Sequence, residues 1–205
     1  EGWSLYLTIG LSLALGIGIF FLAPAAAGPA GEHFLGWSSW WGNLAEGLIR
    51  LLLLVGYIWA VGRIPEISRV FAYHGAEHKT INAFEAGIEL IPEKVSQCSL
   101  EHPRCGTAFL LTLVVLSILL FSLLGPLPAF WRLASRVILL PALAGLSYEY
   151  IRWTARNLNV PFIRWLVKPN LALQRLTTRE PNLEMLEVSI AAFNAMQAKE
   201  RQFSL

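Results

Sequence analysis

Four apolar stretches constrain this chain more than any other feature of its sequence. Each is long enough to cross a lipid bilayer as a helix, which takes about 20 residues. Only 15% of the 205 residues are charged, against about a quarter in a typical soluble domain, so too little polar sequence remains to cover four core helices. We therefore predict an all-α membrane protein with about four transmembrane helices, at residues 5–27, 44–64, 107–125 and 131–151.

The basic residues predict how these helices are oriented. The segments 28–43 and 126–130 contain no Lys or Arg, whereas residues 65–106 and the C-terminal tail contain most of them. Positive charge concentrates on the cytoplasmic side of a membrane, so we expect 65–106 and the C-terminus to be cytoplasmic, and Trp37, Trp40 and Trp41 to lie at the opposite interface. The net charge of +2 is too small for a nucleic-acid-binding surface, so we expect the lipid bilayer as a partner and no nucleic acid.

The chain is expected to consist of a membrane domain, 1–161, and a helical tail, 162–205. Residues 162–180 mix apolar and basic side chains, which favours an interfacial amphipathic element broken near Pro169. The alternative is a cytoplasmic helix that packs on 65–106. A last helix is predicted to open at Pro181, with an apolar stripe that is free to bind a protein partner, formed by Leu183, Leu186, Ile190 and Phe193.

The polar stretch YHGAEHKTINAFE, residues 73–85, predicts a metal site. We expect a helix from about Ser68 to near Gly87, which places His74 and His78 on one face, one turn apart. The pattern H-x-x-E-H is the inverted form of a zinc-protease motif. In such sites the glutamate, here Glu77, takes a proton from metal-bound water. Glu85 lies about three turns past His74. It is a candidate either for a residue that hydrogen-bonds to a metal ligand or for a distant ligand.

A second stretch, CSLEHPRCGT at 98–107, supplies further ligand candidates. Cys98, His102 and Cys105 offer the soft nitrogen and sulfur donors that suit zinc. The first shell is expected to contain His74 and His78 with His102, Cys105 or both, and Cys98 is an additional candidate. Three protein ligands leave a position for water, as in catalytic sites, whereas four close a structural site. The sequence leaves these two alternatives open.

Other ionisable residues are candidates for supporting roles. Arg104 could stabilise an oxyanion or bind a carboxylate. Alternatively, it could anchor the chain at the membrane interface. Glu149 and Arg152 lie three residues apart near the end of the fourth apolar stretch, where ionisable groups are functional candidates by default, although a local ion pair explains them equally well. Glu46 and Arg50, spaced i, i+4, are predicted to form a structural pair.

Four stretches of the sequence resemble a known family. They span most of residues 70–195 and read YHGAEHKTINAFE, HPRCGTAFLL, PALAGLSYEYIR and LQRLTTREP. They resemble the YqhQ family of bacterial membrane proteins, described as metal-dependent enzymes of unassigned activity. The resemblance implies a place in the bacterial inner membrane and a metal site drawn from His74, Glu77, His78, His102 and Cys105.

That family also carries a segment that the numbered sequence lacks. Members typically have a glycine-rich segment, GGQAV…EGVMMR, ahead of the first membrane helix, whereas this chain begins at EGWSLYL. We expect the numbered chain to be part of a longer or processed product. Two functions follow as hypotheses. One is a zinc-dependent hydrolase at the cytoplasmic interface with Glu77 as general base. The other is a non-enzymatic assembly factor, scaffold or regulator with a structural zinc.

Overall fold

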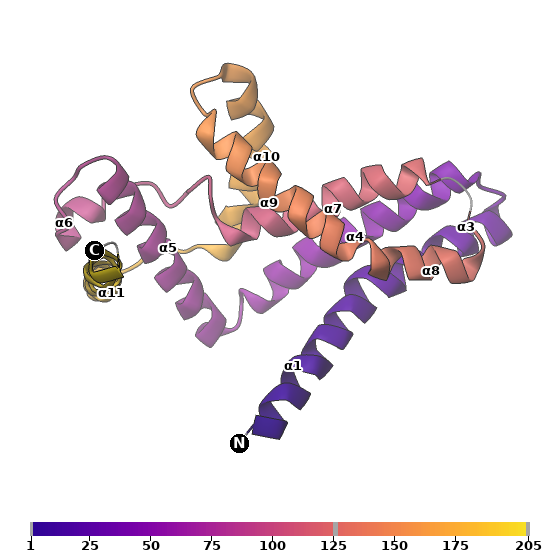
Figure 1. Ribbon diagram of the computed structural model, residues 1–205, viewed down its shortest axis with the longest axis horizontal. Coiled ribbons are helices and arrows are strands. Elements are labelled where there is room, and N and C mark those ends of the chain that lie inside the picture. The colour runs from indigo at the N-terminus through magenta and orange to yellow at the C-terminus, as the bar shows by residue number, and fades with distance from the viewer. Residues whose placement is uncertain (1, 125–126, 204–205) are drawn as a thin grey trace. The chain divides into compact units, whose positions relative to one another are not determined.

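Helices account for all the regular structure that a computed structural model gives for residues 2–124 and 127–203 (Figure 1). The prediction of an all-α protein is therefore confirmed. The helices, including one π-helix labelled η1, are α1 (Gly2–Ile17), η1 (Gly18–Leu22), α2 (Ala23–Ala25), α3 (Ala27–Leu35), α4 (Ser39–Val61), α5 (Pro65–Glu85), α6 (Pro92–Val95), α7 (Gly106–Leu123), α8 (Ala129–Ile138), α9 (Leu140–Arg156), α10 (Pro161–Thr177) and α11 (Leu183–Phe203).

Within the described residues, three helical runs are long and apolar enough to span a membrane. They are Gly2–Leu35, Ser39–Val61 and Gly106–Leu123, with mean hydropathies of 2.2, 1.8 and 2.4. The fourth predicted span is a pair of helices, α8 and α9, bent by 43°. Pro141 lies at the second position of α9. Proline lacks an N–H and crowds the preceding turn, which explains the break. The described residues thus contain three candidate spans, or four with the bent pair, which agrees with the predicted number; residue 125 lies outside the described residues.

The contacts within the chain divide it into two compact units. Unit 1 consists of residues 1–56 and 109–153, and unit 2 consists of residues 57–108 and 154–205. Unit 2 therefore combines the segment between the second and third spans with the C-terminal helices. That the chain consists of a membrane domain, 1–161, and a helical tail, 162–205, stays a prediction.

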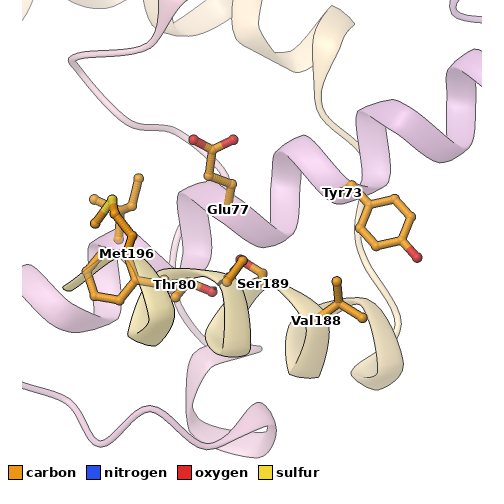
Figure 2. Close-up of a pocket in the computed structure, with 9 residues that line it drawn as sticks. Tyr73, Glu77, Thr80, Val188, Ser189 and Met196 are labelled. Carbon is orange, nitrogen blue, oxygen red and sulfur yellow. Dashed lines mark hydrogen bonds between the residues drawn. The ribbon is translucent and has the colours of Figure 1, made fainter. Parts of the chain in front are cut away.

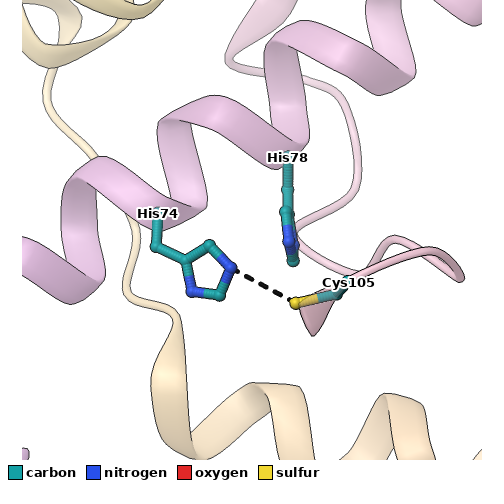
Figure 3. A group of neighbouring side chains, drawn as sticks. All are labelled: His74, His78 and Cys105. Carbon is teal, nitrogen blue, oxygen red and sulfur yellow. Dashed lines mark hydrogen bonds between the residues drawn. The ribbon is translucent and has the colours of Figure 1, made fainter. Parts of the chain in front are cut away.

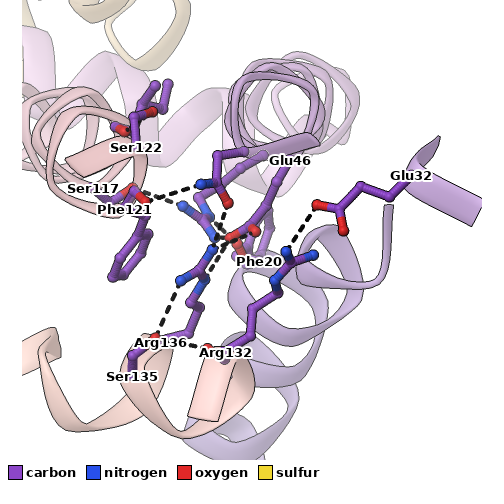
Figure 4. Close-up of polar contacts among 12 residues, drawn as sticks. Phe20, Glu32, Glu46, Ser117, Phe121, Ser122, Arg132, Ser135 and Arg136 are labelled. Atoms are coloured by element: carbon purple, nitrogen blue, oxygen red, sulfur yellow. Dashed lines mark hydrogen bonds and ion pairs between the residues drawn. The ribbon is translucent and has the colours of Figure 1, made fainter. Parts of the chain in front are cut away.

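A buried ionic network links the helices of unit 1 (Figure 4). Arg50 and Arg136 each lie 2.7 Å from the Glu46 carboxylate, and all three side chains are 1% exposed. An ionised group inside a membrane protein is tolerated when it faces such partners, so the predicted pair of Glu46 and Arg50 is confirmed and extended by a second arginine. The two guanidinium groups also donate to the Phe20 carbonyl, Asn43, Ser117 and Ser135.

The last helix, α11, packs on its own chain in unit 2. Leu186 and Ile190 join Ala76, Ala83 and Val95 of α5 and α6 in a buried cluster, and the Phe193 ring lies 4.9 Å from that of Phe84. Part of the stripe that the sequence assigned to a partner is therefore covered by α5 and α6. The helix begins at Leu183 rather than Pro181 because the Asn182 side chain caps it, accepting a hydrogen bond from the Met185 N–H.

The expected break near Pro169 does not occur. Helix α10 runs continuously through Pro169, although proline removes one helical hydrogen bond. Val167 and Asn170, on either side of the proline, are buried, so packing within unit 2 holds both halves of the helix in line. This packing agrees with the alternative that residues 162–180 form a helix packed on 65–106.

We expect Glu46→Gln to lower the free energy of unfolding by about 3 kcal/mol or more, because removing one partner of a buried ion pair leaves buried charge uncompensated. Unfolding of the purified protein in increasing SDS measures this effect. The matched control is Glu149→Gln, whose partner Arg152 is 3.6 Å away and about half exposed, and which should cost less than about 1 kcal/mol. Equal midpoints for the two variants would contradict the role assigned to Glu46.

Candidate functional site

Helix α5 presents His74 and His78 on one face, with ring centroids 4.3 Å apart. Proline at the first helical position starts the helix at Pro65, and Gly87, in the left-handed region with φ 67°, follows its end. The predicted helix is confirmed, with a start about one turn earlier than Ser68. The i, i+4 spacing thus brings the two imidazoles together as expected.

Backbone carbonyls fix both imidazole rings. Nδ1 of His74 lies 2.9 Å from the Thr177 carbonyl oxygen, and Nδ1 of His78 lies 2.6 Å from the Leu100 carbonyl oxygen. A carbonyl only accepts, so each Nδ1 must carry the proton and donate. Each Nε2 is then the nitrogen available to a ligand. Histidines that bind metals are typically held in this way by their other nitrogen.

Cys105 completes a group of three side chains (Figure 3). Its Sγ lies 3.3 Å from His74 Nε2, and the ligand atoms of His74, His78 and Cys105 all lie within 4.8 Å of one another. The sulfur also accepts a hydrogen bond from the Thr107 N–H, at 3.4 Å in the first turn of α7, and lies 3.1 Å from the Thr107 hydroxyl. Helix α5 and the stretch that leads into α7 therefore meet at this sulfur.

The surroundings of Cys105 favour its thiolate. Burial raises the pKa of this thiol, but hydrogen bonds from His74, His78 and Thr107 outweigh burial and lower the pKa to about 5. The hydrogen bond between Cys105 and His74 is also the main cause that raises the pKa of His74. The thiolate is the form of cysteine that binds metals, and a metal ion displaces such shared protons when it binds.

The donor set and its spacing fit a transition metal. Zinc binds histidine nitrogen at about 2.0–2.1 Å and cysteine sulfur at about 2.3 Å, so neighbouring donors in a tetrahedral site are roughly 3.5 Å apart. The 3.3 Å separation of Cys105 Sγ and His74 Nε2 matches such an edge. Within the part of the chain that the structure describes, the group of three includes no fourth His, Cys, Asp or Glu. The His74–His78–Cys105 cluster could therefore hold a metal ion.

His102 lies beside this group but does not belong to it. Its ring centroid is 5.8 Å from that of His78. Its Nε2 is buried, has no hydrogen-bond partner among the described residues and lies 3.6 Å from the Glu85 carboxylate. Burial is the main cause that lowers the pKa of His102. Gln174 fixes the backbone here, because its side chain accepts from the His102 N–H and donates to the His102 carbonyl, at 2.9 and 2.8 Å. The role of His102 as a ligand stays a prediction.

The two acidic candidates on α5 occupy different surroundings. Glu85 lies 3.1 Å from the Arg104 guanidinium, so Arg104 pins a carboxylate, one of the uses expected for it. Glu77 is exposed and lines a groove between α5 and α11 with Tyr73 and Ser189. In Figure 2 its carboxylate extends from α5 on the side away from α11. The catalytic roles of Glu77 and Arg104 stay predictions.

The remaining candidates are not members of the group of three. The Cys98 sulfur faces the Lys94 carbonyl oxygen at 3.8 Å and packs against the core between α5, α6 and α11. Glu149 and Arg152 form an exposed ion pair on α9, as the alternative interpretation of their spacing predicts. Both belong to unit 1, whereas the group of three belongs to unit 2.

Several residues that build the site were missed in the sequence. Lys79 donates to the Ser96 and Cys98 carbonyls at 2.6 and 2.9 Å, and Asn82 donates to the Ser99 and Glu101 carbonyls at 2.8 and 3.0 Å. Together they hold the loop that carries His102 and Cys105 against α5. One signal was present, because Asn82 lies at the i+4 position from His78 and continues the polar stripe of the helix.

Gly75 allows a second segment to approach α5 closely. A Cβ atom at this position would overlap the Arg179 carbonyl oxygen and crowd the Leu100 side chain. The same segment is anchored by the Arg179 N–H, which donates to the Phe71 carbonyl at 3.0 Å. It includes Thr177, whose carbonyl orients His74. The glycine within YHGAEH is therefore part of the site geometry.

Comparison with known proteins places the chain in a family. It belongs to the family described as "Protein of unknown function (DUF1385)", which matches residues 1–199. It is 40% identical over 151 residues to the Uncharacterized protein YqhQ of Bacillus subtilis (strain 168), a match that covers 74% of this chain and 48% of that protein. The chain thus spans about half the length of the curated relative it matches. No solved structure matches it. The predicted membership of the YqhQ family is confirmed.

We expect Gly75→Ala to open the site by pushing the Thr177–Arg179 segment away from α5. Overpacking of this kind costs about 1–3 kcal/mol, which corresponds to roughly 5- to 150-fold more frequent local opening. Alkylation of buried Cys105 in a Cys98→Ser background measures this opening as a faster labelling rate. The control is Gly106→Ala, where a Cβ meets nothing within 4 Å. If both variants label at the rate of the parent, Gly75 does not hold the site closed.

Proposed function

We propose that this membrane protein binds zinc through His74, His78 and Cys105 and uses it for hydrolysis at the cytoplasmic surface of the bacterial inner membrane. One observation carries the proposal. Both histidines are fixed at Nδ1 by backbone carbonyls, and their Nε2 atoms converge with the Cys105 sulfur in a group whose ligand atoms lie within 4.8 Å. Imidazole and thiolate together are donors that suit zinc.

The number of ligands favours a catalytic site over a structural one. Two histidines and one cysteine leave one tetrahedral position for water or substrate, as in known catalytic zinc sites with three protein ligands. Zinc held by these residues would act as a Lewis acid and would lower the pKa of a water molecule to about 7. The cytoplasmic placement rests on the basic residues of 65–106 and of the tail.

The neighbouring carboxylates would supply the proton chemistry. Glu77 lies between the two histidines in the sequence and is exposed to solvent, so it can exchange protons with water. The pKa of His74 is raised mainly by Cys105 and, as the smallest cause, by the charge of Glu77, which supports a carboxylate near the ligands. We assign Glu77 the role of general base. Arg104 holds Glu85 in place and would steady negative charge that develops on a substrate.

The second candidate function is a scaffold or regulator with a structural zinc. It is favoured by His102, whose buried Nε2 has no hydrogen-bond partner in the part of the chain that the structure describes and whose ring neighbours His78. A turn of this ring would supply a fourth nitrogen ligand. A protein partner would then bind the groove of about 350 Å³ between α5 and α11, which is lined mainly by apolar side chains such as Val188, Phe193 and Met196.

The metal content of purified variants tests the ligand set. We expect about one zinc per chain in the parent and in His102→Ala, and almost none in His78→Ala or Cys105→Ala, because two remaining donors cannot hold zinc against a chelator. Cys98→Ala is the matched control, since Cys98 packs outside the group. A loss of zinc in His102→Ala equal to that in His78→Ala would favour the closed structural site. Equal, near-zero zinc in parent and variants would end the proposal.

Glu77→Gln separates the two functions once zinc is bound. An enzyme should keep its zinc and its fold in this variant but fail to complement a strain that lacks the protein, because the amide cannot accept a proton. The control is Glu93→Gln, an exposed carboxylate in α6. Full complementation by zinc-replete Glu77→Gln would support the scaffold and would rule out Glu77 as general base.

A further inference from the structure

A basic pocket lies on α10, and its lining includes none of the proposed metal ligands His74, His78 and Cys105. It has a volume of about 490 Å³. Arg164, Lys168 and Arg175 line it at i, i+4 and i+11, spacings that place all three on one stripe of the helix. The rest of its lining is mainly apolar and includes Leu158, Val167 and Leu171. The pocket therefore combines an apolar wall with three cationic groups.

The charges in this pocket do not balance. Glu101 is the one acidic residue among its lining residues, and its carboxylate binds the Arg175 guanidinium at 2.7 Å. The side chains of Arg164 and Lys168 have no hydrogen-bond or ion-pair partner among the residues that the structure describes, and both are exposed. Two positive charges thus remain for an anion, and a guanidinium beside an ammonium suits the oxygens of a phosphate group.

The neighbouring surface of α10 indicates where that phosphate comes from. Phe162 and Trp165 are both 63% exposed, and their rings stack with centroids 6.4 Å apart. Trp165 lies one turn from Lys168 on the helix surface. Exposed aromatic rings beside basic residues are typical of helices that lie in the headgroup region of a membrane, and the chain has helices that are long and apolar enough to span one.

Other side chains of α10 explain how the pocket is held in position. Ile163 and Gln174 are buried in unit 2, and Gln174 forms two hydrogen bonds with the His102 backbone. Helix α10 therefore contacts the neighbourhood of the candidate metal site through buried side chains and exposes Arg164 and Lys168 at the surface. The pocket does not use any of the three metal-ligand candidates.

We propose that this pocket binds the phosphate group of an anionic membrane phospholipid. Arg164 and Lys168 contact the phosphate oxygens, the apolar wall receives the adjoining glycerol and upper acyl chain, and Phe162 and Trp165 lie among the neighbouring lipids. The site is independent of the proposed zinc chemistry, and its loss leaves the metal content unchanged.

Native mass spectrometry of the full chain in detergent tests the proposal, with phosphatidylglycerol and neutral phosphatidylcholine as probes. We expect the parent to retain phosphatidylglycerol preferentially and Arg164→Ala/Lys168→Ala to bind it at least about tenfold more weakly, since each basic side chain near anionic lipid contributes several-fold in affinity. Lys168→Arg, which keeps the charge, should retain the lipid. The matched control is Lys199→Ala/Arg201→Ala, which removes the same charge from exposed positions of α11.

Two results would overturn the proposal. One is equal retention of phosphatidylglycerol by the parent and the Arg164→Ala/Lys168→Ala variant. The other concerns the source of the phosphate and comes from adding millimolar inorganic phosphate. Displacement of the lipid, or phosphate adducts that appear in the parent and not in the double variant, would assign the pocket to a soluble phosphate compound instead. Unchanged lipid retention in excess phosphate is the result that we expect.

Discussion

The candidate site depends on side chains of α5 that hold backbone carbonyls from distant parts of the chain. His78, Lys79 and Asn82 donate to the 96–101 loop, and His74 binds the Thr177 carbonyl. Buried carbonyls need such donors because an unsatisfied one costs about 1–3 kcal/mol. The histidines therefore have a double role, since the bonds that fold the loop also orient the nitrogens that face Cys105.

The membrane helices and the site helix could be predicted from the sequence because both depend on local spacing. Hydropathy alone gives the spans, and a four-residue step gives the shared face of His74 and His78. The two carbonyls that fix these histidines could not be predicted, because residues 22 or more positions apart meet only in the folded chain. For the same reason the sequence could not decide between His102 and Cys105, whose orientation depends on Gln174 and Thr107. The helix through Pro169 also reflects packing that propensity does not capture.

The two units handle charge in different ways. In unit 1 the network around Glu46 is buried and serves to bind helices to one another. In unit 2 Lys79 is buried and donates to the Ser96 and Cys98 carbonyls, whereas Arg164 and Lys168 on α10 are exposed. Helix α10 bonds to the proposed metal site through Gln174 and Thr177 and carries the proposed lipid-binding pocket. The two proposed sites together would suit an activity at a membrane surface.

The central claim is that the Cys105 sulfur and the two histidines of α5 bind one metal ion. X-ray absorption at the zinc edge of the purified, zinc-loaded protein tests it most directly, because it counts sulfur ligands without a substrate. The account predicts one sulfur at about 2.3 Å and the remaining ligands at about 2.0–2.1 Å, as nitrogen or oxygen. Two sulfurs would bring Cys98 into the site, and none would remove Cys105 from it. Either result would contradict the account.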